Sequence, residues 1–213
     1  MKFTVADHLG AVQRSLSTRT REGRPMRVLA AVRTFDAAPE ELWDALTTPE
    51  RIQIWLGSTS GDFRVGGRFA IEHNASGDIV ACDKPRLIGV TWEFDGDISW
   101  VDATLTPSGD GTALTVEHTA AIPPEFWEQY GSGATGIGWE MALLAIAEHL
   151  AAPDAPPLDP ADPELQGPFN EFMAASSIGW ADADIADGGD PDQARAAAER
   201  TLAFYTGSDG PEA

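Results

Sequence analysis

The sequence G-W-E-M-A-L-L-A-I-A-E-H-L occupies residues 138–150 and is the starting point for interpreting the whole chain. Its large apolar residues recur at a helical spacing and form one stripe made of Trp139, Leu143, Ile146 and Leu150. Further Met, Leu and Ala residues widen this stripe over most of the helix circumference. The run is shorter than the roughly 20 apolar residues that a membrane-spanning helix needs. It therefore predicts a helix that is covered by protein on nearly all sides.

The segments before this helix are expected to form the part of the protein that covers it. After Gly57 the apolar residues change to a spacing of two, which is typical of half-buried strands. In the run 87–94, for example, one face carries Ile88, Val90, Trp92 and Phe94. Gly-rich and Asp-rich turns separate these short runs as far as His118, so we expect an antiparallel meander that curves around the helix.

Two short helices are expected between the first core strand, Val28 to Phe35, and this meander. Pro39 followed by two glutamates is typical of a helix start, because proline fits the first turn and acids favour the positive end of the helix. Thr48 and Pro49 predict a second start, with Thr48 as the N-cap. Upstream, residues 3–12 have a weak helical pattern, and residues 15–35 predict a hairpin.

The C-terminal part differs in composition. Residues 151–168 contain six prolines and predict a stiff, extended connector. Residues 169–185 return to helical spacing, and a last helix is expected from Asp190 to a stop at Gly207. We expect this two-helix tail to pack on the body of the chain or on a second copy.

The composition narrows the classes of function. The net charge is −20 over 213 residues, and such a surface repels nucleic acid and anionic membranes. The first residues carry no apolar core of a secretion signal, so we expect a cytoplasmic protein. The single cysteine, Cys82, has no basic neighbour or motif in the sequence and receives no role. The Gly-rich run 131–138 lacks the lysine of a nucleotide-binding loop and is interpreted as a flexible entry to the long helix.

The order of these motifs resembles the START-type helix-grip superfamily, also called SRPBCC. The resemblance rests on P-E-E-L-W-D-A-L-T-T-P-E-R-I-Q-I-W (39–55), G-D-F-R-V-G-G-R-F (61–69), R-L-I-G-V-T-W-E-F (86–94), T-L-T-P-S-G-D-G-T-A-L-T-V-E-H (104–118) and the long helix. Within the superfamily, the chain is most similar to the group named for activators of the Hsp90 ATPase. The resemblance covers residues 28–150.

The resemblance implies an α+β fold, in which an antiparallel sheet wraps around a long C-terminal helix (helix-grip), with two short helices after the first core strand. The resemblance also implies a cavity for an apolar or aromatic small molecule. It implies no catalytic residues, because no single catalytic motif is common to the superfamily. We expect a helix-grip domain over residues 1–152, with an N-terminal helix and hairpin extension (1–27) before the family core (28–150). A Pro-rich connector (153–168) and the extra two-helix tail (169–213) complete the chain.

Three functions remain open. The preferred one is non-catalytic binding of an apolar or aromatic molecule, with no cofactor, by a lining of inward-facing side chains. The expected lining residues are Trp55, Phe69, Ile71, His73, Val90, Trp92, Val101, His118, Trp139 and Leu143. The first alternative is an enzyme of the polyketide cyclase or dehydratase type, with His73 and His118 as weak catalytic candidates beside carboxylates such as Glu72 or Glu117. The second is a co-chaperone-like module or a homodimer formed through the tail.

A metal site is not expected. The chain has four histidines, at positions 8, 73, 118 and 149, and no two of them have the spacing of a zinc-binding pair. For His118 the simpler interpretation is a core histidine that is hydrogen-bonded to a neighbour.

Overall fold

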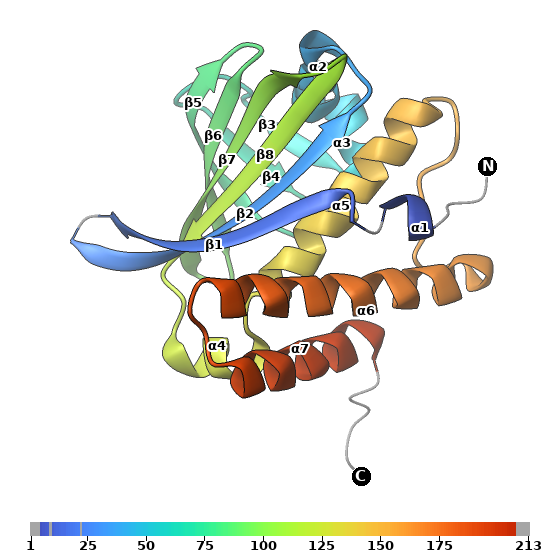
Figure 1. Cartoon of the computed structure of the whole chain (residues 1–213). Helices are drawn as coiled ribbons and strands as arrows, with labels where there is room; N and C mark the ends of the chain where they lie inside the picture. Colours follow the sequence, from blue (N-terminus) through green and yellow to red (C-terminus); the bar gives the residue numbers. More distant parts are fainter. Residues whose placement is uncertain (1–4, 9, 22, 208–213) are drawn as a thin grey trace. The chain divides into compact units, whose positions relative to one another are not determined.

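The fold is described here from a computed structural model that covers residues 5–8, 10–21 and 23–207 (Figure 1). In chain order, the elements are α1 (Val5–His8), β1 (Val12–Arg21), β2 (Arg24–Phe35), α2 (Pro39–Thr47), α3 (Pro49–Trp55), β3 (Thr59–Gly61), β4 (Arg68–Ile71), β5 (Ser76–Asp83), β6 (Leu87–Phe94), β7 (Asp97–Ser108), β8 (Gly111–Ala120), α4 (Pro124–Tyr130), α5 (Gly133–Ala151), α6 (Pro163–Ala186) and α7 (Pro191–Thr206). Of the helix expected over residues 3–12, only Val5–His8 is described as helix, and residues 3, 4 and 9 lie outside the described part.

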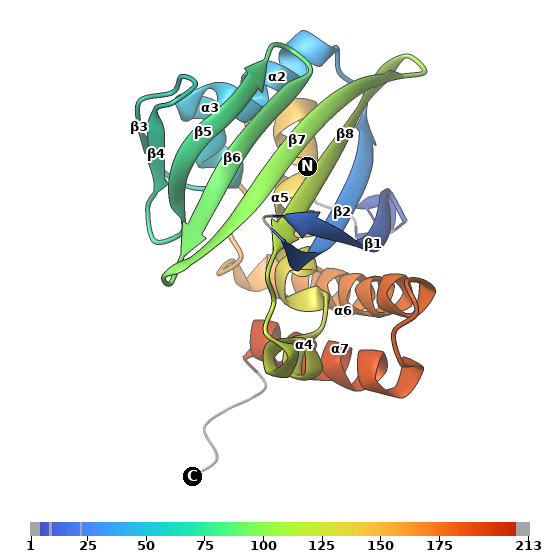
Figure 2. The same cartoon turned by 90° about the vertical axis from the view of Figure 1, so that its left-hand side faces the viewer.

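The eight strands form one sheet in the order β1-β2-β8-β7-β6-β5-β4-β3. Strands β3 to β8 pair antiparallel with their neighbours, as Figure 2 shows for the labelled strands. With the long helix α5, the sheet confirms the predicted α+β fold of the helix-grip type, including the two short helices α2 and α3 after the strand β2.

The chain divides into two compact units. One contains residues 1–31, 121–141 and 158–213, and the other contains residues 32–120 and 142–157. The strand β2 and the helix α5 each contribute residues to both units.

In the second unit, strand register places one row of side chains across the sheet. Ile79 pairs with Val90, Val90 with Val101, and Val101 with His118. Because side chains alternate along a strand, the residues two positions away lie on the same face. This inner face is the one along which the second half of α5 runs (Figure 1), and it continues into the buried residues Leu105, Leu114 and Val116.

The two short helices begin where expected, but one cap differs. Pro39 and Pro49 occupy the first helical positions of α2 and α3. Thr48 precedes α3 but caps no backbone N–H through its side chain. Its hydroxyl donates instead to Asp44 Oδ1 at 2.8 Å, so Thr48 ties α3 back to α2.

The first unit corrects two expectations about the C-terminal part. The connector is shorter than residues 153–168, because α6 already begins at Pro163, capped by the Asp162 side chain, and includes Pro168. Proline at the first helical position loses no intrahelical hydrogen bond, so Pro163 is compatible with this early start. The Gly-rich run 131–138 is mostly helical, since α5 begins at Gly133.

The tail packs on its own chain within this unit. Figure 1 shows α6 and α7 side by side with α4 next to α7. The Ser132 hydroxyl donates to the Trp180 carbonyl at 2.9 Å, and the Tyr205 hydroxyl donates to the Ala134 carbonyl at 2.9 Å. Both tail helices therefore hold the first turns of α5.

A buried ion pair also joins β1 to α5 in the first unit. Glu140 is 1% exposed, and both of its carboxylate oxygens accept from Arg14, at 2.5 and 2.6 Å. Such a bidentate pair fixes geometry, and losing one partner would leave a buried charge without compensation.

The glycine of α5 that faces Trp180 provides a test of this packing. A Cβ at Gly136 would lie 2.2 Å from the buried Trp180 ring, whereas a Cβ at Gly167 in α6 would meet nothing within 4 Å. We expect Gly136→Ala to lower the free energy of unfolding by about 1–3 kcal/mol through overpacking. Gly167→Ala, the matched control, should raise it by roughly 0.5–1 kcal/mol. Urea unfolding followed by circular dichroism measures both values, and equal effects would contradict the packing.

Candidate ligand-binding face

An apolar cluster lies on the inner face at the β4, β5 and β6 strands. Its buried members are Phe69, Ile71 and Ile79. Partly buried residues pack against them from β6 and from the end of α3, namely Val90, Trp92 and Leu56. The structure therefore brings together four of the predicted lining residues: Phe69, Ile71, Val90 and Trp92.

Three rings continue this cluster across the sheet. The Phe69 and Trp92 ring centroids are 6.3 Å apart in a tilted arrangement. The Trp92 and His118 centroids are 6.4 Å apart, edge to face. These separations are typical of favourable aromatic pairs. The rings therefore form a connected aromatic surface from β4 to β8.

His118 is held in this surface by a short hydrogen-bond chain. The Ser99 hydroxyl donates to the Trp92 carbonyl at 3.1 Å, and His118 Nε2 lies 2.8 Å from the same hydroxyl oxygen. Because the hydroxyl proton is already used, Nε2–H of His118 is the donor in the second bond. Burial lowers the pKa of His118 to about 4, so the ring is neutral at neutral pH.

Strand β6 is unusual for a central strand, because its inner apolar side chains are only partly covered. It has β5 on one side and β7 on the other. Nevertheless Ile88, Val90 and Trp92 all keep intermediate exposure, and Phe94 is exposed. By contrast, Leu114 and Val116 on β8 are buried. The helix and sheet thus leave the β6 part of the inner face incompletely covered within this unit.

The remaining predicted lining residues occupy several places. Val101 is buried in the register row beside Val90, and Leu143 is buried on the second half of α5. Trp55 is half-buried at the end of α3, where its Nε1–H donates to the Ala45 carbonyl at 3.0 Å. Trp139 is half-buried on α5 and belongs to the first unit.

The expected inward orientation of His73 is wrong. Strand β4 ends at Ile71, and His73 lies in the following turn at a φ of 57°, with its side chain 91% exposed. A left-handed residue interrupts the alternation of faces, so counting every second residue from Phe69 fails there. Its ring approaches the exposed Glu72 at 3.6 Å, and it is not brought to His118.

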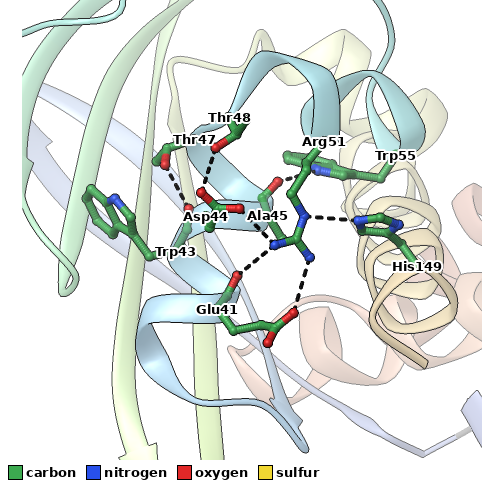
Figure 3. Close-up of polar contacts among 9 residues, drawn as sticks. All are labelled: Glu41, Trp43, Asp44, Ala45, Thr47, Thr48, Arg51, Trp55 and His149. Atoms are coloured by element: carbon green, nitrogen blue, oxygen red, sulfur yellow. Dashed lines mark hydrogen bonds and ion pairs between the residues drawn. The ribbon is translucent and has the colours of Figure 1, made fainter. Parts of the chain in front are cut away.

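A polar cluster between α2, α3 and α5 was not predicted (Figure 3). Arg51 Nε donates to His149 Nε2 at 3.0 Å, and Arg51 Nη1 donates to Asp44 Oδ2 at 2.9 Å. Nη2 of the same guanidinium lies 3.5 Å from Glu41 Oε1. The i, i+4 spacing of Arg51 and Trp55 places both on one side of α3, but no sequence pattern relates Arg51 to a histidine 98 residues away.

The charges of this cluster are set by its geometry. Hydrogen bonds from Arg51 and Thr48 lower the pKa of Asp44. Burial lowers the pKa of His149, and the adjacent Arg51 charge lowers it further. His149 is therefore a neutral imidazole between an arginine and the end of α5.

The described residues contain neither a metal-binding cluster nor a helix that could span a membrane. Within residues 5–8, 10–21 and 23–207, His, Cys, Asp and Glu form no group of three or more that is suited to hold a metal ion. Over the same ranges, no helix combines the length and apolar character that crossing a membrane requires.

Burial of His118 predicts a pH dependence of stability. Its pKa falls from 6.5 in the unfolded chain to about 4 in the fold, so only the unfolded chain takes up this proton between those values. Stability is therefore lost as pH falls from 6.5 to 4, by on the order of 3 kcal/mol from this group. Urea titrations at pH 7 and pH 4 should show a smaller loss for His118→Gln than for wild type. His73→Gln, at an exposed histidine, should behave like wild type, and an unchanged slope in His118→Gln would contradict the assignment.

Comparisons with known proteins agree with this architecture. The family model described as activator of Hsp90 ATPase homolog 1-like protein matches residues 36–151. The crystal structure of CalU16 from Micromonospora echinospora is 34% identical, with 81% of this chain and 98% of that chain covered and a TM-score of 0.64. Its solution structure gives 32% identity, coverage of 84% and 97%, and a TM-score of 0.66.

A more distant structure shows the same fold. Protein MLL2253 from Mesorhizobium loti is 27% identical, with 61% of this chain and all of that chain covered and a TM-score of 0.54. Among curated proteins, none matches the sequence. The family match and the likeness to CalU16 confirm the resemblance inferred from the sequence motifs, and the chain belongs to the family of activator of Hsp90 ATPase homolog 1-like proteins.

Proposed function

We propose that this protein binds an apolar or aromatic small molecule between the inner face of the sheet and α5, without catalysis. The observation that carries the proposal is the incomplete cover of β6, where Val90 and Trp92 stay partly exposed next to a buried apolar cluster. Burying about 100 Å² of such surface under a ligand would contribute about 2.5 kcal/mol. The ring surface of Phe69, Trp92 and His118 favours a flat or aromatic ligand.

The chemistry of His118 supports binding more than catalysis. A cyclase or dehydratase would need at least two titratable groups that converge on the ligand. His73 lies in an exposed turn, and the pKa of His118 is lowered to about 4, far from that of an efficient base at neutral pH. Glu72 is exposed, and Glu117 alternates with His118 along β8 and so lies on the other face. The proposed catalytic pair is therefore not brought together.

An interaction role has one observation in its favour. Phe126 of α4 and Phe204 of α7 are 42% and 63% exposed, and Tyr130 lies between them with ring centroids 5.2 and 5.9 Å away. Exposed aromatic clusters are typical of association surfaces. Dimer formation through the tail is thus kept as a second candidate, and a cytoplasmic location stays a prediction.

The binding proposal is tested at Trp92. Native mass spectrometry with a panel of flat aromatic compounds and fatty acids identifies a ligand, and calorimetry then gives its Kd. Trp92→Ala should weaken binding about tenfold or more, because a buried aromatic contact contributes about 1.5–3 kcal/mol. Trp92→Phe should weaken it less.

The control for this test is Trp100→Ala. Trp100 is half-buried on β7 and pairs with Thr91, so it lies on the other face of the sheet from Trp92. Its removal should leave Kd unchanged in a protein with the wild-type circular dichroism spectrum. Failure of every compound to bind, or equal Kd values for wild type and Trp92→Ala, would refute the proposal.

The dimer candidate is tested by light scattering of the full chain. If the tail surface pairs two copies, the mass should be twice 22.7 kDa, and Phe204→Asp should return it to the single-chain value. The matched control, Phe94→Asp, changes a similarly exposed phenylalanine in the other unit and should keep the dimer mass. A single-chain mass for wild type at high concentration would exclude this candidate.

A further inference from the structure

His149 has a buried hydrogen-bonding atom that the fold leaves without a partner. The residue is 7% exposed. Its Nε2 accepts from Arg51, but in the part of the chain that the structure describes, Nδ1 meets no hydrogen-bond partner. Buried polar atoms of this kind are rare in native proteins, and each one calls for an explanation.

The bond from Arg51 determines what kind of atom Nδ1 is. Arginine stays protonated, so its Nε–H must be the donor and His149 Nε2 must offer a lone pair. A neutral imidazole with an unprotonated Nε2 carries its proton on Nδ1. Nδ1–H is therefore a donor, and the neighbouring guanidinium polarises the ring so that this donor is stronger.

A buried donor without an acceptor costs about 1–3 kcal/mol. An acceptor oxygen placed against Nδ1 would recover this free energy. Cationic or purely apolar groups would not, because neither accepts a hydrogen bond. The unpartnered Nδ1–H thus favours a ligand that carries a hydrogen-bond acceptor.

The surroundings of the ring suit a ligand with an apolar body. Ala142, Ala145 and Ile146 precede His149 by seven, four and three positions on α5, so the same side of this helix presents only apolar side chains before the imidazole. Across from it, Arg51 and Trp55 share one side of α3, and Figure 3 shows both side chains near His149. Leu56, the next residue, packs on the apolar cluster of Phe69, Ile71 and Ile79.

We infer that His149 Nδ1–H donates a hydrogen bond to a carbonyl or carboxylate oxygen of the bound aromatic molecule, and that Arg51 is the positioning residue that holds the ring in this tautomer. This inference rests on the proposed binding function and adds the chemical class of the ligand. The ligand is a flat apolar body with one acceptor oxygen, which lies at Nδ1 of His149.

Three probes that share one ring system test the inference: fluorene, fluorenone and a fluorene carboxylate. With wild-type protein, fluorenone or the carboxylate should bind about 3- to 10-fold tighter than fluorene, the range expected for one net hydrogen bond. The relative affinity of the two oxygen-bearing probes identifies the oxygen as a neutral carbonyl or an anion, and either order supports donation from Nδ1.

His149→Phe should abolish the preference for oxygen while it leaves fluorene binding within about twofold, because only the donor is lost. His73→Phe, which changes a histidine that is exposed in a turn, should keep the preference. For Arg51→Met, a long-range proton–nitrogen NMR spectrum should show that the protonated nitrogen of His149 is no longer Nδ1 alone, and the preference for oxygen should shrink with it.

The outcomes separate the two proposals. If none of the three probes binds wild type, the proposed function fails, and this inference fails with it. If fluorene binds as tightly as the oxygen-bearing probes, or if the preference persists in His149→Phe, only this inference is overturned. In wild type, a downfield shift of the Nδ1 proton on adding fluorenone, but not fluorene, would establish the contact directly.

Discussion

The structure depends on the burial of a helix that is apolar around most of its circumference. A helix of this kind is stable in water only if protein covers it on several sides. In the second unit, Leu143, Leu144 and Ile146 are buried on the half of α5 that runs along the sheet. The sheet thus provides the protein cover that the second half of α5 requires.

The first half of the same helix explains the extra tail. There Gly136 lies so close to Trp180 of α6 that a Cβ would collide with the ring, and the Tyr205 hydroxyl of α7 donates to the Ala134 carbonyl. The tail helices therefore cover the first turns of α5 within the first unit.

Local sequence patterns were enough to predict which side chains of β6 and β8 share the inner face of the sheet. They failed where an unusual backbone conformation or a contact between distant residues determines the position of a side chain. Alternation along β6 and β8 correctly placed Val90, Trp92 and His118 on one face. It failed at His73, because the left-handed backbone there ends the strand. The early start of α6 was missed because prolines were interpreted as a connector, although proline is compatible with a first helical turn.

The contact between Arg51 and His149 shows a different limit. Each residue alone fits an ordinary exposed position on an amphipathic helix. Their hydrogen bond exists only because α3 and the end of α5 meet in the fold, and 98 residues separate the two in sequence. Likewise, the role of Ser99 as the partner of His118 depends on the pairing of β7 with β6 and β8, which a sequence pattern does not specify.

The charge state of the two buried imidazoles bears on the proposed function. The chain carries a net charge of −20, and an acidic surface by itself favours protonated histidines. Burial nevertheless lowers the pKa of His118. Burial and the adjacent Arg51 charge together lower the pKa of His149. Both rings are therefore neutral at neutral pH, but they differ in their partners: the Nε2–H of His118 is already donated to Ser99, whereas Nδ1 of His149 meets no partner among the described residues. Under the proposed function, His149 would orient a neutral or weakly acidic aromatic molecule through a single hydrogen bond, while the acidic exterior would disfavour polyanions. Neutral donors at fixed positions serve selection of a ligand better than they serve proton transfer, which requires a group that titrates near the working pH.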